Sequence, residues 1–302
     1  MDIFGHFRRI LVFVVNFLLN RPTILRFVGH INKRLPFLKS VFVAYGASEE
    51  YSYAYVYPKH RHFMKWKPWI AGIFKQNGKW GLMMVVSSLE EDFHDLNNTE
   101  NLKLLLDSTE NIRVMLNAPQ KSFAGILPGI FFMRRLIRES VEADVTVYAV
   151  AKALAEVEKA EGCDKDTPII VLGGRGFIGR RFVKKVECCR RVYSVDLVDN
   201  GDGKWPEHLF GQKVIMVNIA KTDAVLSYPL WPGVILLNEA YPAPSGEGLE
   251  KLTSAGCAVY HVVGVKAMSL PSFPHDYMGG IPCCAAWNSN EMEVLVKRLG
   301  RP

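Results

Sequence analysis

Apolar positions follow more than one period along the chain. Residues 10–19, ILVFVVNFLL, form an apolar run at helical spacing that basic residues flank. From residue 40 the pattern alternates, over 40–58 and again over 69–88, and the second stretch contains Asn77-Gly78, the strongest short signal for a β-hairpin. We therefore expect an N-terminal helical segment followed by antiparallel strands.

Helical periodicity returns in two longer stretches. Residues 101–117 end shortly before Pro119, and residues 141–162 form a long amphipathic pattern that Gly162 stops. Both are expected to be helices of an α+β domain.

The last part of the chain alternates short apolar strands with helices. After a strand that begins at residue 167, strands are expected at 191–196, 213–220, 233–242 and 257–265, with a helix over 246–256. Continuous apolar strands that alternate with helices are typical of a parallel sheet covered on both faces. The sequence therefore predicts an α/β fold with a basic amphipathic helical segment over 1–39, an α+β substrate domain over 40–162 and a Rossmann-like parallel sheet over 163–302.

A glycine-rich turn opens this last domain. Residues 167–186, TPIIVLGGRGFIGRRFVKKV, read as a strand, a glycine turn and a basic helix, and the glycines match both G-x-G-x-x-G and G-x-x-G-x-x-G. Glycine is needed where the backbone turns tightly and where amides approach a pyrophosphate at a helix N-terminus. The pattern predicts dinucleotide binding, and the alternative is a plain turn of a parallel sheet. The residues expected to bind are Gly173, Gly174, Arg175, Gly176, Phe177, Ile178 and Gly179.

Ligands of parallel sheets bind at the carboxyl ends of the strands, where Asp196, Asn218, Asn238 and Glu239 fall. Asp196 lies about 20 residues beyond the turn, where an acid can bond the adenosine ribose hydroxyls. A carboxylate there repels the 2′-phosphate of NADP, so we expect NAD(H) to be favoured over NADP(H). Arginines of the turn and helix, which can pair with that phosphate, are the counterargument.

The cysteines offer a candidate nucleophile. None of Cys163, Cys188, Cys189, Cys257, Cys283 and Cys284 stands in a C-x-x-C pair, so no metal site is expected. The adjacent pair in MGGIPCCAAW, 278–287, fits either core packing or a thiolate nucleophile. The loop after Gly264 is expected to lead Cys283 to the nicotinamide end of the dinucleotide site, which favours the nucleophile. His261, His275 and Lys266 are the candidate acids for the leaving thiol.

The whole layout resembles the long-chain acyl-(acyl carrier protein) reductases, which make fatty aldehydes. The likeness covers residues 70–295 and rests on NGKWG, FAGILPGIFF, VTVYAVAKAL, LLNEAYP and a late cysteine followed by small residues. The resemblance implies that an N-terminal half holds the acyl chain, that a C-terminal half binds NADPH, and that Cys283 takes the acyl group as a thioester. It further implies an acyl carrier protein or coenzyme A thioester as substrate and an aldehyde as product.

Two alternatives stay open. One is an NAD(P)-dependent dehydrogenase of another substrate class, on the plan of shikimate dehydrogenases or glutamyl-tRNA reductases, in which Cys283 only packs. The other is a non-enzymatic, membrane-associated dinucleotide-binding protein. A short-chain reductase is not expected, because no tyrosine after Gly179 is followed four residues later by the lysine that this class needs.

Charge is concentrated at the N-terminus. The chain has a net charge of +7, and residues 1–48 supply +6 of it, from seven Lys and Arg against Asp2 alone. An apolar run of ten is too short to cross a bilayer, which needs about 20 residues, but basic residues around such a stripe suit a helix on an anionic membrane. Packing of segment 1–38 on the protein's own core is the alternative, and nucleic acid is not expected. Without a recognisable signal peptide, we expect a cytoplasmic protein, peripheral at the inner face of the membrane if segment 1–38 lies on it.

Overall fold

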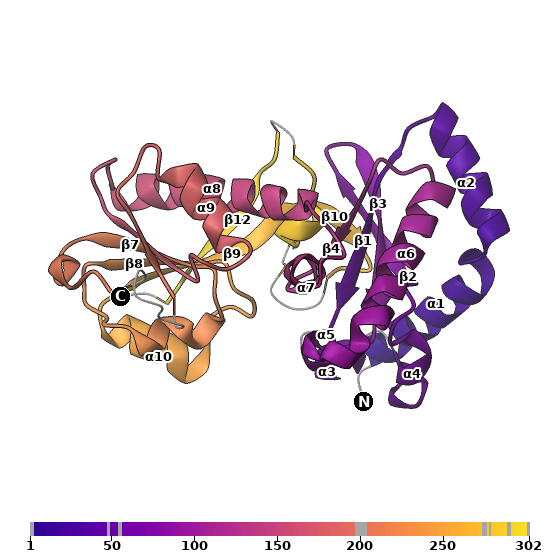
Figure 1. The fold of residues 1–302 in the computed structure, drawn as a ribbon, viewed down its shortest axis with the longest axis horizontal. Coiled ribbons are helices and arrows are strands. Elements are labelled where there is room, and N and C mark those ends of the chain that lie inside the picture. The colour runs from indigo at the N-terminus through magenta and orange to yellow at the C-terminus, as the bar shows by residue number, and fades with distance from the viewer. Residues whose placement is uncertain are drawn as a thin grey trace. The chain divides into compact units, whose positions relative to one another are not determined.

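The computed structural model describes residues 3–46, 49–53, 56–196, 204–273, 277, 279–288 and 291–300. The chain forms two compact units, one of Met1–Glu142 with Lys266–Glu291 and one of Ala143–Val265 with Met292–Pro302 (Figure 1). Each unit contains a β-sheet covered by helices, which confirms the predicted α/β class.

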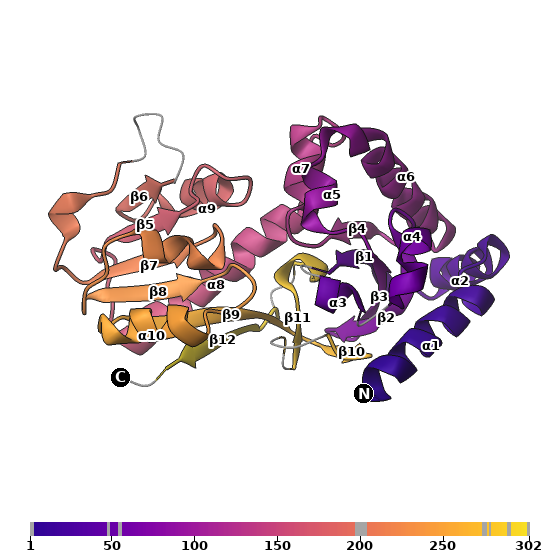
Figure 2. The same ribbon diagram turned by 90° about the horizontal axis from the view of Figure 1, so that it is seen from below.

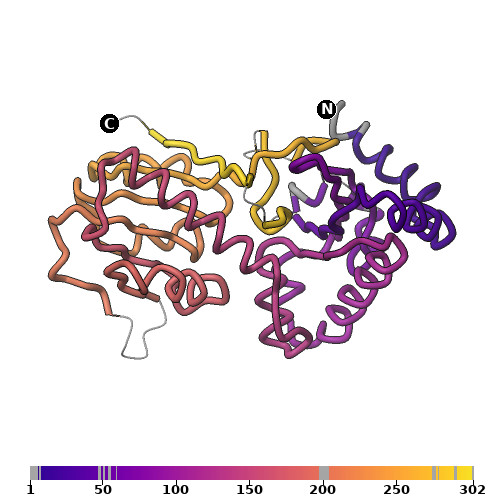
Figure 3. Tube along the Cα trace, turned by 90° about the horizontal axis from the view of Figure 1, so that it is seen from above, coloured from indigo at the N-terminus to yellow at the C-terminus, as the bar shows by residue number. Residues whose placement is uncertain are grey.

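The first unit begins with two helices, α1 (Ile3–Leu19) and α2 (Pro22–Arg34), which follow one another in the indigo part of the tube in Figure 3. Proline at the start of α2 suits its first turn, where the missing N–H is not needed. Within the described part of the chain no single helix is long and apolar enough to cross a membrane. Residues Arg8–Leu19 and Pro22–Arg34 pass that test only together, with a bend of 82° between them.

The sheet of the first unit has the strand order β10-β2-β3-β1-β4. Its strands are β1 (Leu38–Tyr45), β2 (Trp69–Gln76), β3 (Lys79–Val86), β4 (Gln120–Phe123) and β10 (Met268–Leu270). Asn77 and Gly78 join β2 to β3 as the predicted antiparallel hairpin, and both have positive φ, 47° and 76°. Such values are those of the tight hairpin turns whose twist matches the strands.

The expectation of antiparallel strands over 40–58 is wrong in two respects. Strand β1 runs parallel to both β3 and β4. Residues Glu49–Tyr53 form a short helix, α3, and Pro58–His60 (η1) and Arg61–Met64 (α4) are helical turns. A period-two pattern gives a strand only where a partner strand is available. Both edges of β1 are taken by β3 and β4, and this segment instead carries the chain back to the start of β2.

Helices cover the first sheet on one side and the returning C-terminal segment covers it on the other. The core includes Val41 and Val43 of β1, packed with Leu105 of α6 (Thr99–Met115) and Phe131 of α7 (Leu127–Met133). On the opposite face Phe42 contacts Phe273, and Phe74 contacts Trp287. The remaining elements of this unit are α5 (Glu90–His94), η2 (Leu96–Asn98), α6 (Thr99–Met115), α7 (Leu127–Met133), β11 (Gly280–Ile281) and η5 (Cys283–Ala285).

The second unit contains the predicted parallel sheet. Its strands are β5 (Ile169–Leu172), β6 (Val192–Val195), β7 (Val214–Asn218), β8 (Val234–Asn238), β9 (Ala258–Lys266) and β12 (Val294–Leu299). The order β9-β8-β7-β5-β6 is parallel throughout, and β12 adds to β9 in antiparallel sense (Figure 2). Strand β11 stands next to β9 in the same sheet. Helices α8 (Val141–Glu161) and α9 (Gly179–Val186) lie on one face and α10 (Gly246–Ser254) on the other, as Figure 1 shows. The turns η3 (Glu207–Leu209) and η4 (Thr222–Ser227) complete the unit.

This division differs from the expected one at both ends of the second domain. Helix α8 from Ala143 belongs with the parallel sheet, although we had assigned it to the substrate domain. The chain leaves β9 at Lys266 and then supplies β10, which pairs with β2 in the first sheet. The open edge of a sheet can pair with any segment that reaches it. The three residues of β10 are too few to show the alternation of apolar and polar side chains that would predict a strand.

Candidate functional site

The glycine turn lies between β5 and α9, as the sequence predicts. Gly173 follows β5 with a φ of +76°, and its N–H donates to the carbonyl of Val195 at 2.9 Å. The N–H of Gly176 donates back to the carbonyl of Gly173 at 2.9 Å, and α9 begins at Gly179. The chain thus reverses tightly at the carboxyl end of a buried strand.

Two of these glycines occupy positions where no side chain fits. A Cβ atom on Gly174 would lie 2.2 Å from the hydroxyl oxygen of Ser194. A Cβ atom on Gly179 would lie 2.0 Å from the carbonyl oxygen of Gly173. The first contact brings the turn against β6 and the second brings the start of α9 against the turn, which are reasons for glycine in a dinucleotide-binding turn.

The turn stands at the topological switch point of the sheet. Strand β5 has β6 on one side and β7 on the other, so the order reverses between β5 and β7. The loop after β7 approaches the turn there, because a Cβ atom on Gly173 would lie 3.0 Å from that of Ala220. Ligands of open α/β sheets bind outside the carboxyl ends of the strands at such a point.

Three buried polar residues link the carboxyl ends of β7 and β8 to the middle of β9. Asn218, Asn238 and His261 lie in register on adjacent strands. The Asn218 side-chain amide donates to that of Asn238 at 2.8 Å, and the amide nitrogen of Asn238 lies 3.1 Å from Nδ1 of His261. The Asn218 side chain also bonds Ala220 N–H and the carbonyl of Lys221. The structure therefore gives these residues a role in holding the loop after β7, and it places the candidate acid His261 in the same network.

Glu239 directly follows β8, and its N–H donates to the carbonyl of Asn218 at 2.9 Å. Its side chain is partly buried, and burial raises the pKa of its carboxyl to about 8. At neutral pH this group keeps its proton and can donate a hydrogen bond. Sequence reasoning placed Glu239 on the cofactor side, but it could not show the burial that sets its charge.

Asp196 ends β6 beside the glycine turn, since the carbonyl of the preceding Val195 accepts from the N–H of Gly173. Burial and the charge of Asp196 raise the pKa of Tyr228, which stacks on Trp205 with ring centroids 5.2 Å apart. This aromatic pair beside the acid was missed in the sequence, because its members lie on separate loops without a motif.

The arginines near the turn differ in the exposure of their side chains. Arg175 and Arg180 are exposed. The guanidinium of Arg180 lies 5.7 Å from the ring centroid of Phe177, and that of the half-buried Arg181 lies 4.0 Å from it and donates to the Phe177 carbonyl. Arg175 and Arg180 are therefore the cations that could meet a phosphate group. Phe177 and Ile178 are both partly buried parts of the same turn.

The paired cysteines lie in the first unit, on the short turn η5. The expectation that the chain after Gly264 stays with the dinucleotide domain is wrong, because Lys266–Glu291 groups with the first unit and its strand β10 pairs with β2, although β11 adds to the second sheet. Cys283 is buried with 8% of its surface exposed, whereas Cys284 is partly exposed. Of the candidate acids, Lys266 is exposed at the end of β9 and belongs to the first unit, and His275 lies outside the described residues.

Tyr45 organises the carboxyl end of β1, near Cys284. Its hydroxyl donates to Glu90 at 3.1 Å and accepts from the N–H of Ile126 at 3.1 Å. Burial raises the pKa of Tyr45, and the charges of Glu90 and, to a smaller extent, Cys284 raise it further. A Cβ atom on Gly125 would lie 2.2 Å from the Tyr45 hydroxyl, so this loop is packed closely against the ring.

The segment FAGILPGIFF, 123–132, supplies core residues of the first unit. Phe123, Leu127 and Phe131 are buried in the same cluster as Leu105 of α6. Among the residues that the structure describes, no group of three or more His, Cys, Asp or Glu is placed to hold a metal ion.

No protein-family model matches the chain, and no curated protein matches it.

Proposed function

We propose that the chain is an NAD(P)H-dependent oxidoreductase that reduces an acyl thioester to an aldehyde through an acyl-enzyme on Cys283. The observation that carries the dinucleotide part is the steric demand for glycine at Gly174 and Gly179, in a turn between a buried strand and a helix at the switch point. The thioester part rests on the sequence resemblance and on the cysteine pair.

The residues present fit a dinucleotide. Backbone amides of the turn and the N-terminus of α9 would face the pyrophosphate, and Arg175 or Arg180 would add positive charge. Asp196 would accept hydrogen bonds from the adenosine ribose hydroxyls. Its carboxylate would repel a 2′-phosphate, which supports NAD(H) over NADP(H) as the cofactor.

The proposed reaction begins with the Cys283 thiolate, which attacks the acyl carbonyl of a thioester on coenzyme A or an acyl carrier protein. The bond from the carbonyl carbon to the carrier sulfur breaks, and the carrier thiol leaves with a proton. When bound, a dinucleotide would supply the hydride to the acyl carbon. The bond from that carbon to the Cys283 sulfur then breaks, which releases the aldehyde and regenerates the thiolate.

The test uses the full chain and acyl-coenzyme A without a dinucleotide. Intact-mass measurement should show one acyl adduct on the wild type and on Cys284→Ala, and none on Cys283→Ala. With NADH added, the adduct should disappear as aldehyde forms. The mechanism is contradicted if Cys283→Ala carries an acyl adduct or if the wild type carries none.

The low exposure of Cys283 specifically favours the second candidate, a dehydrogenase of another substrate class in which this cysteine packs. That function predicts tight NADH binding without any acyl adduct, and a Cys283→Ala variant that retains turnover. The same set of measurements therefore separates the two candidates.

A further inference from the structure

Helix α1 packs on the rest of the first unit through buried Val12 and through two polar side chains. The side-chain amide of Asn16 donates to the carbonyl of Ile70, and Ile70 N–H donates to the Asn16 amide oxygen, both at 2.7 Å. One helical turn on, Asn20 donates to the carbonyl of Pro68 at 3.3 Å. Asn16 thus satisfies both backbone groups of one residue at the edge of β2, as a neighbouring strand would.

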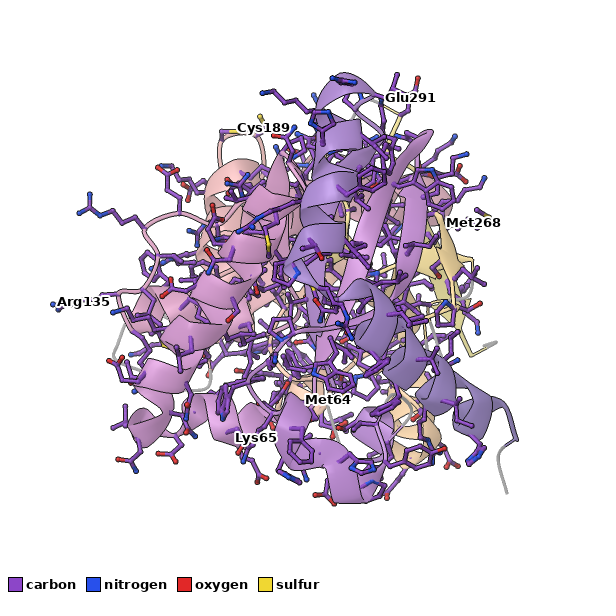
Figure 4. All side chains as sticks on the ribbon, turned by 90° about the vertical axis from the view of Figure 1, so that its right-hand side faces the viewer. Met64, Lys65, Arg135, Cys189, Met268 and Glu291 are labelled. Carbon is purple, nitrogen blue, oxygen red and sulfur yellow. The ribbon has the colours of Figure 1, made fainter. Side chains whose placement is uncertain are left out.

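Most apolar side chains of α1 lie on its exposed side, whereas Val12 is buried and Val15 packs against the core. Ile10, Phe13, Val14, Phe17 and Leu18 recur at helical spacing, and all of them are exposed. The solvent-exposed face of this helix is therefore apolar, whereas a surface helix usually exposes polar side chains. Helix α2 adds exposed Phe27 and Ile31, exposed Leu35 directly follows it, and both helices lie on the side that faces the viewer in Figure 4. This number of exposed apolar side chains on two successive helices is unfavourable in water and marks an interaction site.

Charge indicates which partner covers this face. Residues 3–46 contain seven Lys and Arg and no Asp or Glu. Contact between two copies through this face would bring the cations together, and a nucleic acid would leave the apolar side chains in water. A bilayer with anionic headgroups satisfies both features, because acyl chains accept the apolar stripe while the headgroups neutralise the cations.

A pocket of about 330 Å³ opens beside α1 and supports the same partner. Arg9, His60 and Lys67 line it together with apolar side chains such as Phe13, Phe63 and Trp69, and no acidic residue contributes. The guanidinium of Arg9 lies over the ring of Tyr57, 5.2 Å from its centroid, and its Nε atom is buried without a hydrogen-bond partner. A buried guanidinium nitrogen that lacks an acceptor suits the phosphate of a lipid headgroup.

We propose that α1 and α2 form a face that binds the interfacial layer of an anionic bilayer, with a lipid phosphate in the pocket beside α1. The apolar stripe enters the headgroup boundary, and Arg26 and Arg34, both exposed on or next to that stripe, contact the anionic surface. This binding is independent of the proposed reductase activity.

The test is flotation of the full chain with vesicles of phosphatidylcholine alone and of equimolar phosphatidylcholine and phosphatidylglycerol. The wild type should bind the anionic vesicles, more weakly as salt is raised, and should not bind the neutral ones. Inorganic phosphate should displace it no better than chloride at equal ionic strength. Equal binding to both vesicles, or binding to neither, overturns the proposal.

Paired variants locate the face. Phe17→Ser with Leu18→Ser should weaken binding at least about tenfold, because it removes two inserted side chains. Leu104→Ser with Val114→Ser on α6 is the matched control, since these residues have similar exposures of 58% and 57%, against 63% and 52%. Circular dichroism should show that all variants remain folded, because every changed side chain is exposed.

Charge variants complete the test. Arg26→Glu with Arg34→Glu should weaken binding at least about tenfold, and Lys159→Glu with Lys165→Glu, exposed in the second unit, should leave it unchanged. Arg9→Gln should reduce the preference for the anionic vesicles. If the Phe17 and Leu18 changes leave vesicle binding intact, or convert a wild-type dimer into a monomer, the face is not a membrane site.

Discussion

Gly179 begins α9 so close to Gly173 that a Cβ atom on Gly179 would lie 2.0 Å from the Gly173 carbonyl oxygen. Gly248, in α10, is a helical glycine of the opposite kind, because its missing Cβ would meet only ordinary contacts at 3.6 and 3.8 Å. Replacing each glycine with alanine adds the same methyl group. A difference between the two variants therefore reports the close packing at Gly179 and not the methyl group itself.

We expect Gly179→Ala to lower the free energy of unfolding by about 1–3 kcal/mol, as overpacking does, and to weaken dinucleotide binding. Gly248→Ala should be neutral or stabilise by up to about 1 kcal/mol, because alanine favours a helix. Urea unfolding and a fluorescence titration with NADH measure both effects. Equal behaviour of the two variants would show that the turn tolerates a side chain.

The network of Asn218, Asn238 and His261 predicts a large effect of one substitution. Asn238→Leu is close in size, but it removes the side-chain hydrogen bonds to Asn218 and His261, while Asn218 keeps its bond to the Lys221 carbonyl and His261 keeps its bond to the backbone carbonyl of residue 238. It should destabilise the protein by about 1–3 kcal/mol, the cost of the lost buried hydrogen bonds. Asn111→Leu on the exposed side of α6 is the control and should stay within about 0.5 kcal/mol of the wild type.

Asp196 predicts the choice of dinucleotide. At ~4 Å and an effective dielectric near 20, each phosphate charge meets a repulsion on the order of 4 kcal/mol before solvent relaxes it. NADH should therefore bind more tightly than NADPH, and Asp196→Ala should raise the affinity for NADPH. Tenfold tighter binding of NADPH to the wild type in a fluorescence titration would refute this assignment.

Glu239 predicts a pH dependence of stability. Its pKa is raised by burial from 4.5 to about 8, so the folded state resists ionisation that the unfolded chain undergoes freely. The stability tied to the protonated carboxyl is fully present below pH 4.5 and is lost as the pH rises through 8. Because the Glu239 side chain is partly exposed, solvent screening reduces the effect, and the free energy of unfolding falls by on the order of 2 kcal/mol over this range.

Glu239→Gln removes this titration. The variant and the wild type should have similar free energies of unfolding near pH 4.5. The variant should be the more stable protein by about pH 8, and well above that pH the difference between them should stay constant. Urea unfolding across this range measures the difference. A constant difference between the two proteins would show that the carboxyl titrates normally.

Local order along the chain was predictable where a signal involves neighbouring residues only. The hairpin at Asn77-Gly78 follows from two residues that tolerate positive φ, and the turn at 173–179 follows from glycine spacing between a strand and a helix. The helix over 141–161 and the parallel strands of the second unit follow from apolar periodicity in the same way.

Pairing between distant segments was not predictable in this way. The partners of β1 and the role of 266–291 depend on which strand edges stay open once the rest of the sheet has formed, and no local pattern records that. For this reason Cys283 was expected with the dinucleotide domain and is found on the first unit.

The amino-acid sequence by itself determined the α/β class, the glycine turn, the acid that ends the next strand and the basic apolar N-terminus, because each depends on residue type and short spacing. Only the tertiary structure decided that Asn16 turns toward the sheet edge and Phe17 away from it, and that Glu239 keeps its proton. Burial and hydrogen-bond partners are properties of contacts between distant segments, and those contacts form only when the whole chain folds.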